Sequence, residues 1–154
     1  MAVLAGLGRD ADVEELVRRL VVNELLGNFD AHLKNFSLLY IAPQQPVLSP
    51  AYDIVAYACY LNGQGAALRW QPGKAARSTP RSPLDKATLW SLTQAAQDIV
   101  QKAGLRSGIT PQRLQRIAVQ TRQQAMDLWP SQLKELPLTR AQQMKLKKRW
   151  QDIA

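Results

Sequence analysis

This chain of 154 residues has one cysteine, one histidine and few aromatic side chains, which make up 6% of the sequence. A single cysteine, Cys59, excludes an intrachain disulfide, and this fits a reducing compartment. We expect Cys59 to be a small buried hydrophobe rather than a reactive thiol. Because His32 is the only histidine, an Asp-x-His pattern around it cannot indicate a hydrolase zinc site built on two histidines.

Long apolar runs are also absent. No stretch approaches the roughly 18 apolar residues of a membrane span. Residues 1–15 have neither the basic start nor the apolar length of a signal peptide. Apolar residues still make up 46% of the chain and charged residues 21%, which is typical of a globular domain. We therefore expect one soluble, cytoplasmic domain over residues 1–154, with no membrane partner.

The charge balance is basic, with a formal net charge of +8. Such a domain can bind nucleic acid, anionic nucleotides or acidic protein surfaces. One dense cluster stands near the C-terminus: Lys145, Lys147, Lys148 and Arg149. A solvated helix face explains this cluster as well as a ligand does. Charge alone therefore does not select a function.

The spacing of apolar residues predicts a first helix over about residues 12–26. Asp12 is its expected N-cap, and Glu15 completes a capping box. Gly27 is the expected stop, because glycine accepts the left-handed cap conformation. Apolar side chains recur on one face at helical spacing: Val13, Leu16, Val17, Leu20, Val21 and Leu25.

After a polar loop, residues 36–41 and 47–50 predict a small β-hairpin around a turn at 42–46. Residues 61–83 carry proline, glycine and serine, and predict an irregular exposed stretch. Helices are expected from Ser82–Asp85 to Gly104, from Thr110 to Pro130, and after Thr139. The face expected to be buried on the second of these has Leu114, Ile117, Ala118, Thr121, Ala125 and Leu128. On the helix after Thr139, Met144 and Trp150 are expected to point inward. The four tryptophans are expected to anchor helix packing: Trp70, Trp90, Trp129 and Trp150.

The polar loop holds the residue types that phosphoryl transfer needs. A carboxylate must accept the proton of the attacking hydroxyl, and oxygen ligands must hold Mg²⁺ on the nucleotide phosphates. Asp30 and Asn35 have the five-residue separation of the aspartate and asparagine in protein-kinase catalytic loops. Asp53 follows eighteen residues after Asn35, and the hairpin between them would return it beside the loop. Asp30 alone reads more simply as a turn residue; the ordered set favours a kinase-type site.

These segments resemble the C-terminal kinase lobe of the HipA family of bacterial serine/threonine kinase toxins. The family carries a D-x-H-x-x-N catalytic loop, matched here by residues 30–35. A short hairpin and a Pro-x-Tyr-Asp segment follow in the family, matched by residues 50–53. The strong match covers residues 16–57, and the helical remainder, 84–154, has no distinctive motif. The resemblance implies a mainly α fold, a helical kinase-like C-lobe with one small β-hairpin beside the catalytic loop.

The resemblance also implies roles for individual residues. Asp30 would be the catalytic base, and Asn35 and Asp53 would be ligands of Mg²⁺ bound with ATP. Three neighbours would support the loop or contact phosphate: Asn28 as a brace, His32 through a backbone hydrogen bond, and Lys34 near the phosphates. Tyr52 is expected to serve in packing rather than in chemistry.

A complete kinase also needs a lobe that covers the nucleotide. The eleven residues before the first predicted helix are too few for it, and Gly6 and Gly8 lack the context of a phosphate loop. The chain is then a piece of a longer kinase, a partner of a separately encoded N-terminal lobe, or a non-catalytic remnant, and is expected to be inactive alone. Loss of a lobe would expose apolar surface.

The resemblance further implies a HipB-like DNA-binding antitoxin as partner and an aminoacyl-tRNA synthetase as the class of protein substrate. The alternative function is a catalytically incomplete basic module that binds acidic protein or nucleic acid.

Overall fold

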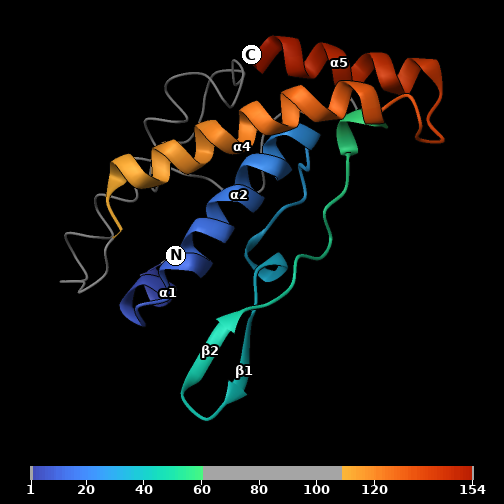
Figure 1. Cartoon of the computed structure of the whole chain (residues 1–154). Coiled ribbons are helices and arrows are strands. Elements are labelled where there is room, and N and C mark those ends of the chain that lie inside the picture. Colours follow the sequence, from blue (N-terminus) through green and yellow to red (C-terminus); the bar gives the residue numbers. More distant parts are fainter. Residues whose placement is uncertain (1, 61–108, 154) are drawn as a thin grey trace, which may run out of the picture.

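The computed structural model describes residues 2–60 and 109–153, and shows a mainly α chain with one small antiparallel hairpin (Figure 1). This is the predicted fold class. The helices and strands in chain order are α1 (Ala2–Gly6), α2 (Asp10–Leu26), the 3₁₀ turn η1 (Leu33–Asn35), β1 (Leu38–Ala42), β2 (Gln45–Leu48), the 3₁₀ turn η2 (Tyr57–Cys59), α4 (Pro111–Gln132) and α5 (Arg140–Ile153).

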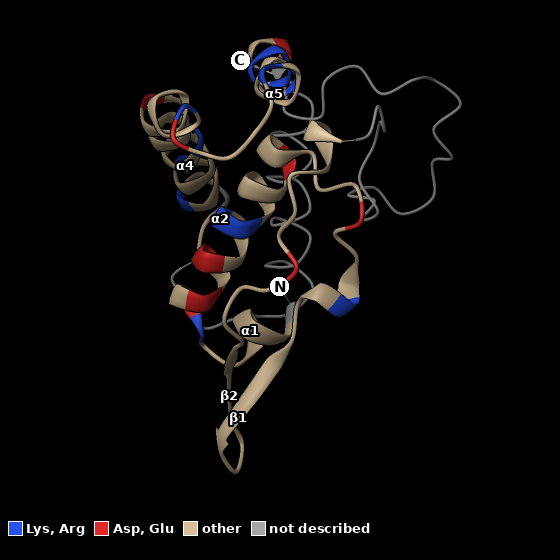
Figure 2. Ribbon diagram, turned by 90° about the vertical axis from the view of Figure 1, so that its right-hand side faces the viewer, with Lys and Arg blue, Asp and Glu red and all other residues tan. Residues whose placement is uncertain are grey.

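Helix α2 is the centre of the described core, and its buried face is the one that helical spacing predicts. Every apolar residue predicted for that face is buried: Val13, Leu16, Val17, Leu20, Val21 and Leu25. Helix α4 packs along α2, and α5 lies across the end of α2 from which the loop leaves (Figure 1). The hairpin extends from the opposite end of the molecule, and Figure 2 shows no charged residue on it.

The predicted start of α2 was wrong by two residues. The helix begins at Asp10 after Arg9, and no side chain caps it. Asp12 lies inside the first turn, where its carboxylate accepts hydrogen bonds from Arg9 Nε at 2.9 Å and from the backbone N–H of Leu48 at 3.2 Å. The residue read as a cap therefore ties α2 to β2. The predicted end is confirmed, because Gly27 caps the helix in the left-handed conformation.

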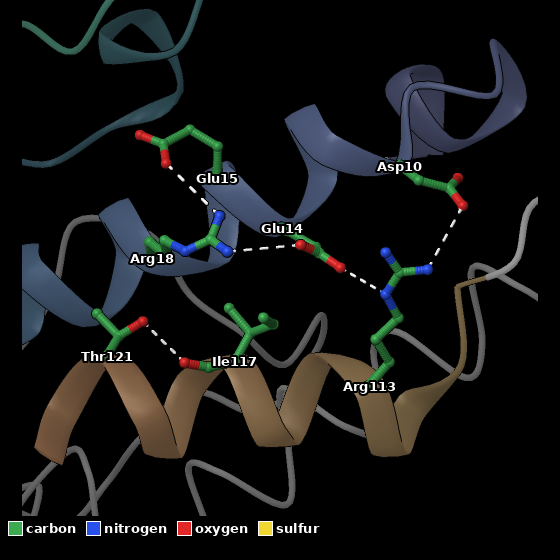
Figure 3. Close-up of polar contacts among 7 residues, drawn as sticks. All are labelled: Asp10, Glu14, Glu15, Arg18, Arg113, Ile117 and Thr121. Atoms are coloured by element: carbon green, nitrogen blue, oxygen red, sulfur yellow. Dashed lines mark hydrogen bonds and ion pairs between the residues drawn. The ribbon is translucent and has the colours of Figure 1, made fainter. Parts of the chain in front are cut away.

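Helix α4 begins as predicted, with Thr110 as its N-cap. The Thr110 hydroxyl accepts from the backbone N–H of Arg113 at 3.2 Å. Arg113 also forms ion pairs with Glu14 and Asp10, and these link the start of α4 to α2 (Figure 3). Pairs this exposed stabilise a fold weakly, so we assign the α2–α4 contact mainly to apolar burial.

Two apolar side chains do not lie where the periodicity placed them. Leu128, near the end of α4, is 56% exposed, and Met144 of α5 is 62% exposed. Helix α4 also continues past Pro130 to Gln132. The last helix begins after Thr139, whose hydroxyl accepts from the backbone N–H of Gln142 as predicted. Between these helices, residues 133–135 form turns.

The predicted hairpin is confirmed, with a shorter turn than expected. β1 pairs with β2 from Leu38–Leu48 to Ala42–Gln45, and the register shifts once between Tyr40 and Ala42. The turn needs only Pro43 and Gln44, and Gln44 has a φ of 62°. Three consecutive residues of β1 are exposed, Leu39, Tyr40 and Ile41, so neither face of this strand end is covered by described residues.

Among the described tryptophans, Trp129 and Trp150 pack together, with ring centroids 5.8 Å apart. This confirms their predicted use as packing anchors between α4 and α5. Trp70, Trp90, the irregular stretch 61–83 and the helix predicted up to Gly104 lie outside the described residues. Within 2–60 and 109–153, no helix is long and apolar enough to cross a membrane.

Cys59 is 2% exposed, as expected of a small buried hydrophobe. Burial raises the pKa of its thiol, and nearby Lys145 opposes only part of this shift. Since the thiolate is the reactive form, we expect a disulfide reagent to label the folded chain at least about a hundredfold more slowly than the urea-unfolded chain. The single cysteine makes the assay unambiguous. Equal labelling rates would contradict the buried position.

Candidate active-site loop

The candidate loop starts at the C-terminus of α2, where the chain turns sharply at Gly27. This residue has a φ of 61°, in the region that favours glycine. Its N–H donates to the Glu24 carbonyl at 3.0 Å, and the N–H of Asn28 donates to the Asn23 carbonyl at 2.8 Å. Two of the carbonyls that a helix end leaves without partners are thus satisfied by the loop itself.

Asn35 closes the loop on itself. Its side-chain oxygen accepts from the backbone N–H of His32 at 2.9 Å, while its own N–H donates to the His32 carbonyl at 3.0 Å. These reciprocal bonds shape the 3₁₀ turn η1. The side-chain nitrogen of Asn35 donates to the carboxylate of Asp53. Asn35 is buried although it is polar, and these bonds account for its position.

Asp53 returns beside the loop, as the hairpin between the two segments predicts. It has a φ of 56°, a conformation that costs an L-residue about 1–2 kcal/mol, with aspartate among the more tolerant types. Its side chain is exposed while its carbonyl is held by Asn28 Nδ2 at 2.9 Å. Strained backbone held by a buried side chain is typical of functional sites.

Asn28 links the loop to both α2 and Asp53. Its side-chain nitrogen donates to Asn23 Oδ1 at 2.6 Å as well as to the Asp53 carbonyl. Asn23 in turn donates to the carbonyl of Arg19, one turn back in α2, at 2.8 Å. Asn28 is 4% exposed, and its own side-chain oxygen has no partner among the described residues. The side chain therefore braces the loop, which agrees with its expected position.

Asp30, His32 and Lys34 are exposed on the outer side of the same loop. The Asp30 carboxylate makes no hydrogen bond or ion pair with another described residue, and Asp30 is exposed. His32 takes part through its backbone N–H and carbonyl, both bonded to Asn35. Of the six expected site residues, the structure brings Asn28, Asn35 and Asp53 into one network. The roles of all six remain predictions.

Sequence reasoning missed part of this network. The Tyr52 hydroxyl donates to the Lys34 carbonyl at 2.6 Å and pairs with the Ser37 hydroxyl at 2.6 Å, so Tyr52 fixes η1 rather than only packing. On α2, the Arg19 side chain donates to the Ser49 carbonyl at 2.7 Å. One signal was present for Asn23: with Glu24 it interrupts an otherwise apolar run, residues 20–26.

The donor set of this loop fits magnesium better than a transition metal. Asp53 offers an exposed carboxylate and Asn35 an amide oxygen that keeps one lone pair beyond its bond to His32. The described residues contain no group of three or more histidine, cysteine, aspartate or glutamate side chains that could hold an ion alone. Mg²⁺ in nucleotide sites needs no such group, because waters and phosphates complete its shell.

Comparison with known proteins finds a matching family model and similar named proteins. The family model of the HipA-like C-terminal domain matches residues 1–129. The chain is 51% identical over 57 residues to "Putative kinase Y4dM" of Sinorhizobium fredii, a match that covers 37% of this chain and 14% of that protein. It is 44% identical over 50 residues to a "Putative kinase" of Haemophilus influenzae, covering 32% of this chain and 15% of that protein.

The matched segments thus span only about one seventh of the length of these relatives. No solved structure matches this chain significantly. The family model, however, covers most of the chain and includes the whole candidate loop with Asp53. The chain therefore belongs to the HipA-like C-terminal domain family.

Proposed function

We propose that this chain is the C-terminal lobe of a HipA-like protein serine/threonine kinase, which binds Mg-ATP and, in the complete kinase, transfers phosphate to a protein hydroxyl. The observation that carries the proposal is the contact between Asn35 and Asp53, residues eighteen positions apart, beside the exposed Asp30. Family membership and the likeness to named kinases support it.

In this proposal, Asp30 accepts the proton of the attacking serine or threonine hydroxyl. Its exposure leaves it open to a protein substrate, and its place four residues after the helix C-terminus fixes the backbone that carries it. A base in this position needs hydrogen-bond reach to the hydroxyl, and the loop supplies that by presenting the carboxylate outward. Lys34, exposed one residue before Asn35, contacts a phosphate oxygen.

Asn35 and Asp53 hold the magnesium ion through their side-chain oxygens. When bound, Mg²⁺ neutralises charge on the nucleotide phosphates. The rest of the network keeps these two side chains in place: Asn28 holds the Asp53 carbonyl, and the His32 backbone orients the Asn35 amide. The strain at Asp53 is consistent with this use, because its backbone conformation aims the carboxylate toward Asn35.

Calorimetry of Mg-ATP binding to the isolated chain tests the proposal. We expect binding that is lost with EDTA and weakened at least about tenfold by Asp53→Ala, because the proposed site loses a carboxylate ligand of the metal. The matched control is Asp127→Ala, which removes an exposed carboxylate from α4.

The outcomes separate this proposal from its alternative, a basic interaction module. Three cations of α5, Lys145, Lys147 and Lys148, are exposed and favour that second reading. Binding of nucleic acid through them would weaken steeply with salt and be indifferent to Asp53→Ala. A folded chain that binds only in this second manner would contradict the kinase-lobe proposal.

The complete system follows from the same proposal. An N-terminal lobe, in a longer chain or encoded separately, covers the nucleotide. A HipB-like DNA-binding antitoxin restrains the kinase, and an aminoacyl-tRNA synthetase is the class of protein that it phosphorylates. ATP and such a substrate place the reaction in the bacterial cytoplasm.

A further inference from the structure

Helix α5 contacts the point at which α2 ends and the candidate loop begins. The family model matches the chain only to residue 129, and α5 (Arg140–Ile153) lies wholly beyond that stretch. Two consecutive side chains of α5, Arg149 and Trp150, nevertheless donate hydrogen bonds to carbonyls in the last turn of α2. Neither residue was expected to contact the loop. Arg149 was grouped with the lysines beside it, and Trp150 was expected only to pack between helices.

These two side chains add to the C-terminal cap of α2. A helix leaves its last four carbonyls without intrahelical partners, and the loop supplies N–H groups for those of Asn23 and Glu24. Arg149 donates to the Glu24 carbonyl from Nε at 2.9 Å and from Nη2 at 2.6 Å. The indole N–H of Trp150 donates to the Leu25 carbonyl at 3.1 Å. A cation at a helix C-terminus also interacts favourably with the helix dipole.

Arg149 is further held by a buried ion pair. Its Nη2 lies 2.7 Å from Glu24 Oε1, with the two side chains 16% and 9% exposed. Burial raises the pKa of Glu24 and lowers that of Arg149, while the pairing opposes both shifts. A pair of this kind fixes the guanidinium in one place, because either charge left alone would be buried without a partner.

The fixed guanidinium touches the loop directly. It lies over the ring of Phe29, with Cζ 5.5 Å from the ring centroid, and Phe29 immediately precedes Asp30. A side-chain carbon at Gly27 would come within 3.1 Å of Arg149 Nε. The arginine therefore also packs against Gly27, the residue at which the loop begins and which we call the loop root. Arg149 thus contacts the segment on both sides of Asn28, which holds Asp53.

We propose that Arg149 is a positioning residue for the candidate active-site loop, and that α5 is part of the support of that loop rather than an appended solvated helix. It acts through the α2 cap, Gly27 and Phe29, and touches neither nucleotide nor substrate. The inference rests on the proposed function only for its consequence in catalysis. The positioning of the loop can be measured without any ligand.

The single histidine of the chain provides that measurement, because His32 lies within the loop. In the full chain, NMR signals of the His32 ring report the loop alone. We expect Arg149→Met to shift or split these signals well below the unfolding temperature. Arg149→Lys should do so less, since lysine keeps the charge but lacks the planar guanidinium with its several N–H donors. Lys147→Ala, an exposed change on the same helix, should leave them unchanged.

Mg-ATP affinity gives the second readout, with an expected loss of about tenfold in Arg149→Met. Unchanged His32 signals in a folded Arg149 variant would overturn the inference. If both Arg149 variants fail to fold, Phe29→Leu decides, because it removes the ring under the guanidinium and leaves the α2 cap intact. Shifted His32 signals in a chain that never binds Mg-ATP would support the positioning while contradicting the proposed function.

Discussion

Gly27→Ala, a change at the buried start of the candidate loop, should destabilise the chain by about 2–5 kcal/mol. Two causes add. The left-handed conformation, at a φ of 61°, costs an alanine about 1–2 kcal/mol. The new methyl group would also lie 2.8 Å from the Cβ of Ala58, and relieving such crowding costs about a further 1–3 kcal/mol. Urea unfolding followed by circular dichroism measures the change.

The chain offers a matched control in Gly8. It has a similar φ of 67°, but a carbon added there meets no atom within 4 Å. Gly8→Ala should therefore show the conformational cost alone, about 1–2 kcal/mol. The difference between the two variants isolates the crowding between the loop root, η2 and α5. Equal losses in the two variants would mean that the loop root is not packed as the structure has it.

Much of the fold follows from local patterns in the sequence. The buried face of α2 follows from helical spacing, and its end follows from the conformational freedom of Gly27. The hairpin and the cap at Thr110 are equally local, because turn residues and a side-chain acceptor determine them. The adjacency of Asn35 and Asp53 was also predictable, since a short hairpin must return the chain close to its start.

The contacts made by α5 were not predictable in this way. Arg149 stands in sequence beside Lys147 and Lys148, and nothing local distinguishes one cation from its neighbours. The distinction arises only when α5 packs against the end of α2 and Glu24, 125 residues earlier, meets the guanidinium. The exposure of Leu128 and Met144 was not predictable for a similar reason. Helical periodicity predicts which residues share a face of a helix, but not how much of that face a neighbouring helix covers.

At Asp12, by contrast, a strong local pattern predicted a helix cap that the structure does not have. Its spacing to Glu15 satisfies a capping box, yet its carboxylate instead bonds Arg9 and the N–H of Leu48. A bond to another element adds tertiary organisation that a local cap does not. This bond helps tie the hairpin to α2, and the hairpin returns Asp53 to the loop.

Asp30→Asn should reduce phosphate transfer by about 10²–10⁴-fold, the usual contribution of a positioned general base. The measurement requires a complete kinase, so the chain is combined with the N-terminal part of a longer relative and incubated with labelled ATP and a protein substrate. Asparagine keeps the size and polarity of the side chain but cannot accept the proton. Because Asp30 bonds no other described residue, the exchange should leave folding and loop geometry unchanged.

The same variant separates the base from the metal ligands. Asp30→Asn should retain Mg-ATP affinity within about twofold, whereas Asp53→Asn should lower both affinity and transfer, because a neutral amide is a weaker ligand for a hard cation. Lys147→Ala, an exposed change on α5, is the control for expression and assembly. Transfer that persists in Asp30→Asn at the wild-type rate would remove Asp30 as the base. The contact between Asn35 and Asp53 would then indicate a nucleotide site whose chemistry is supplied by another residue.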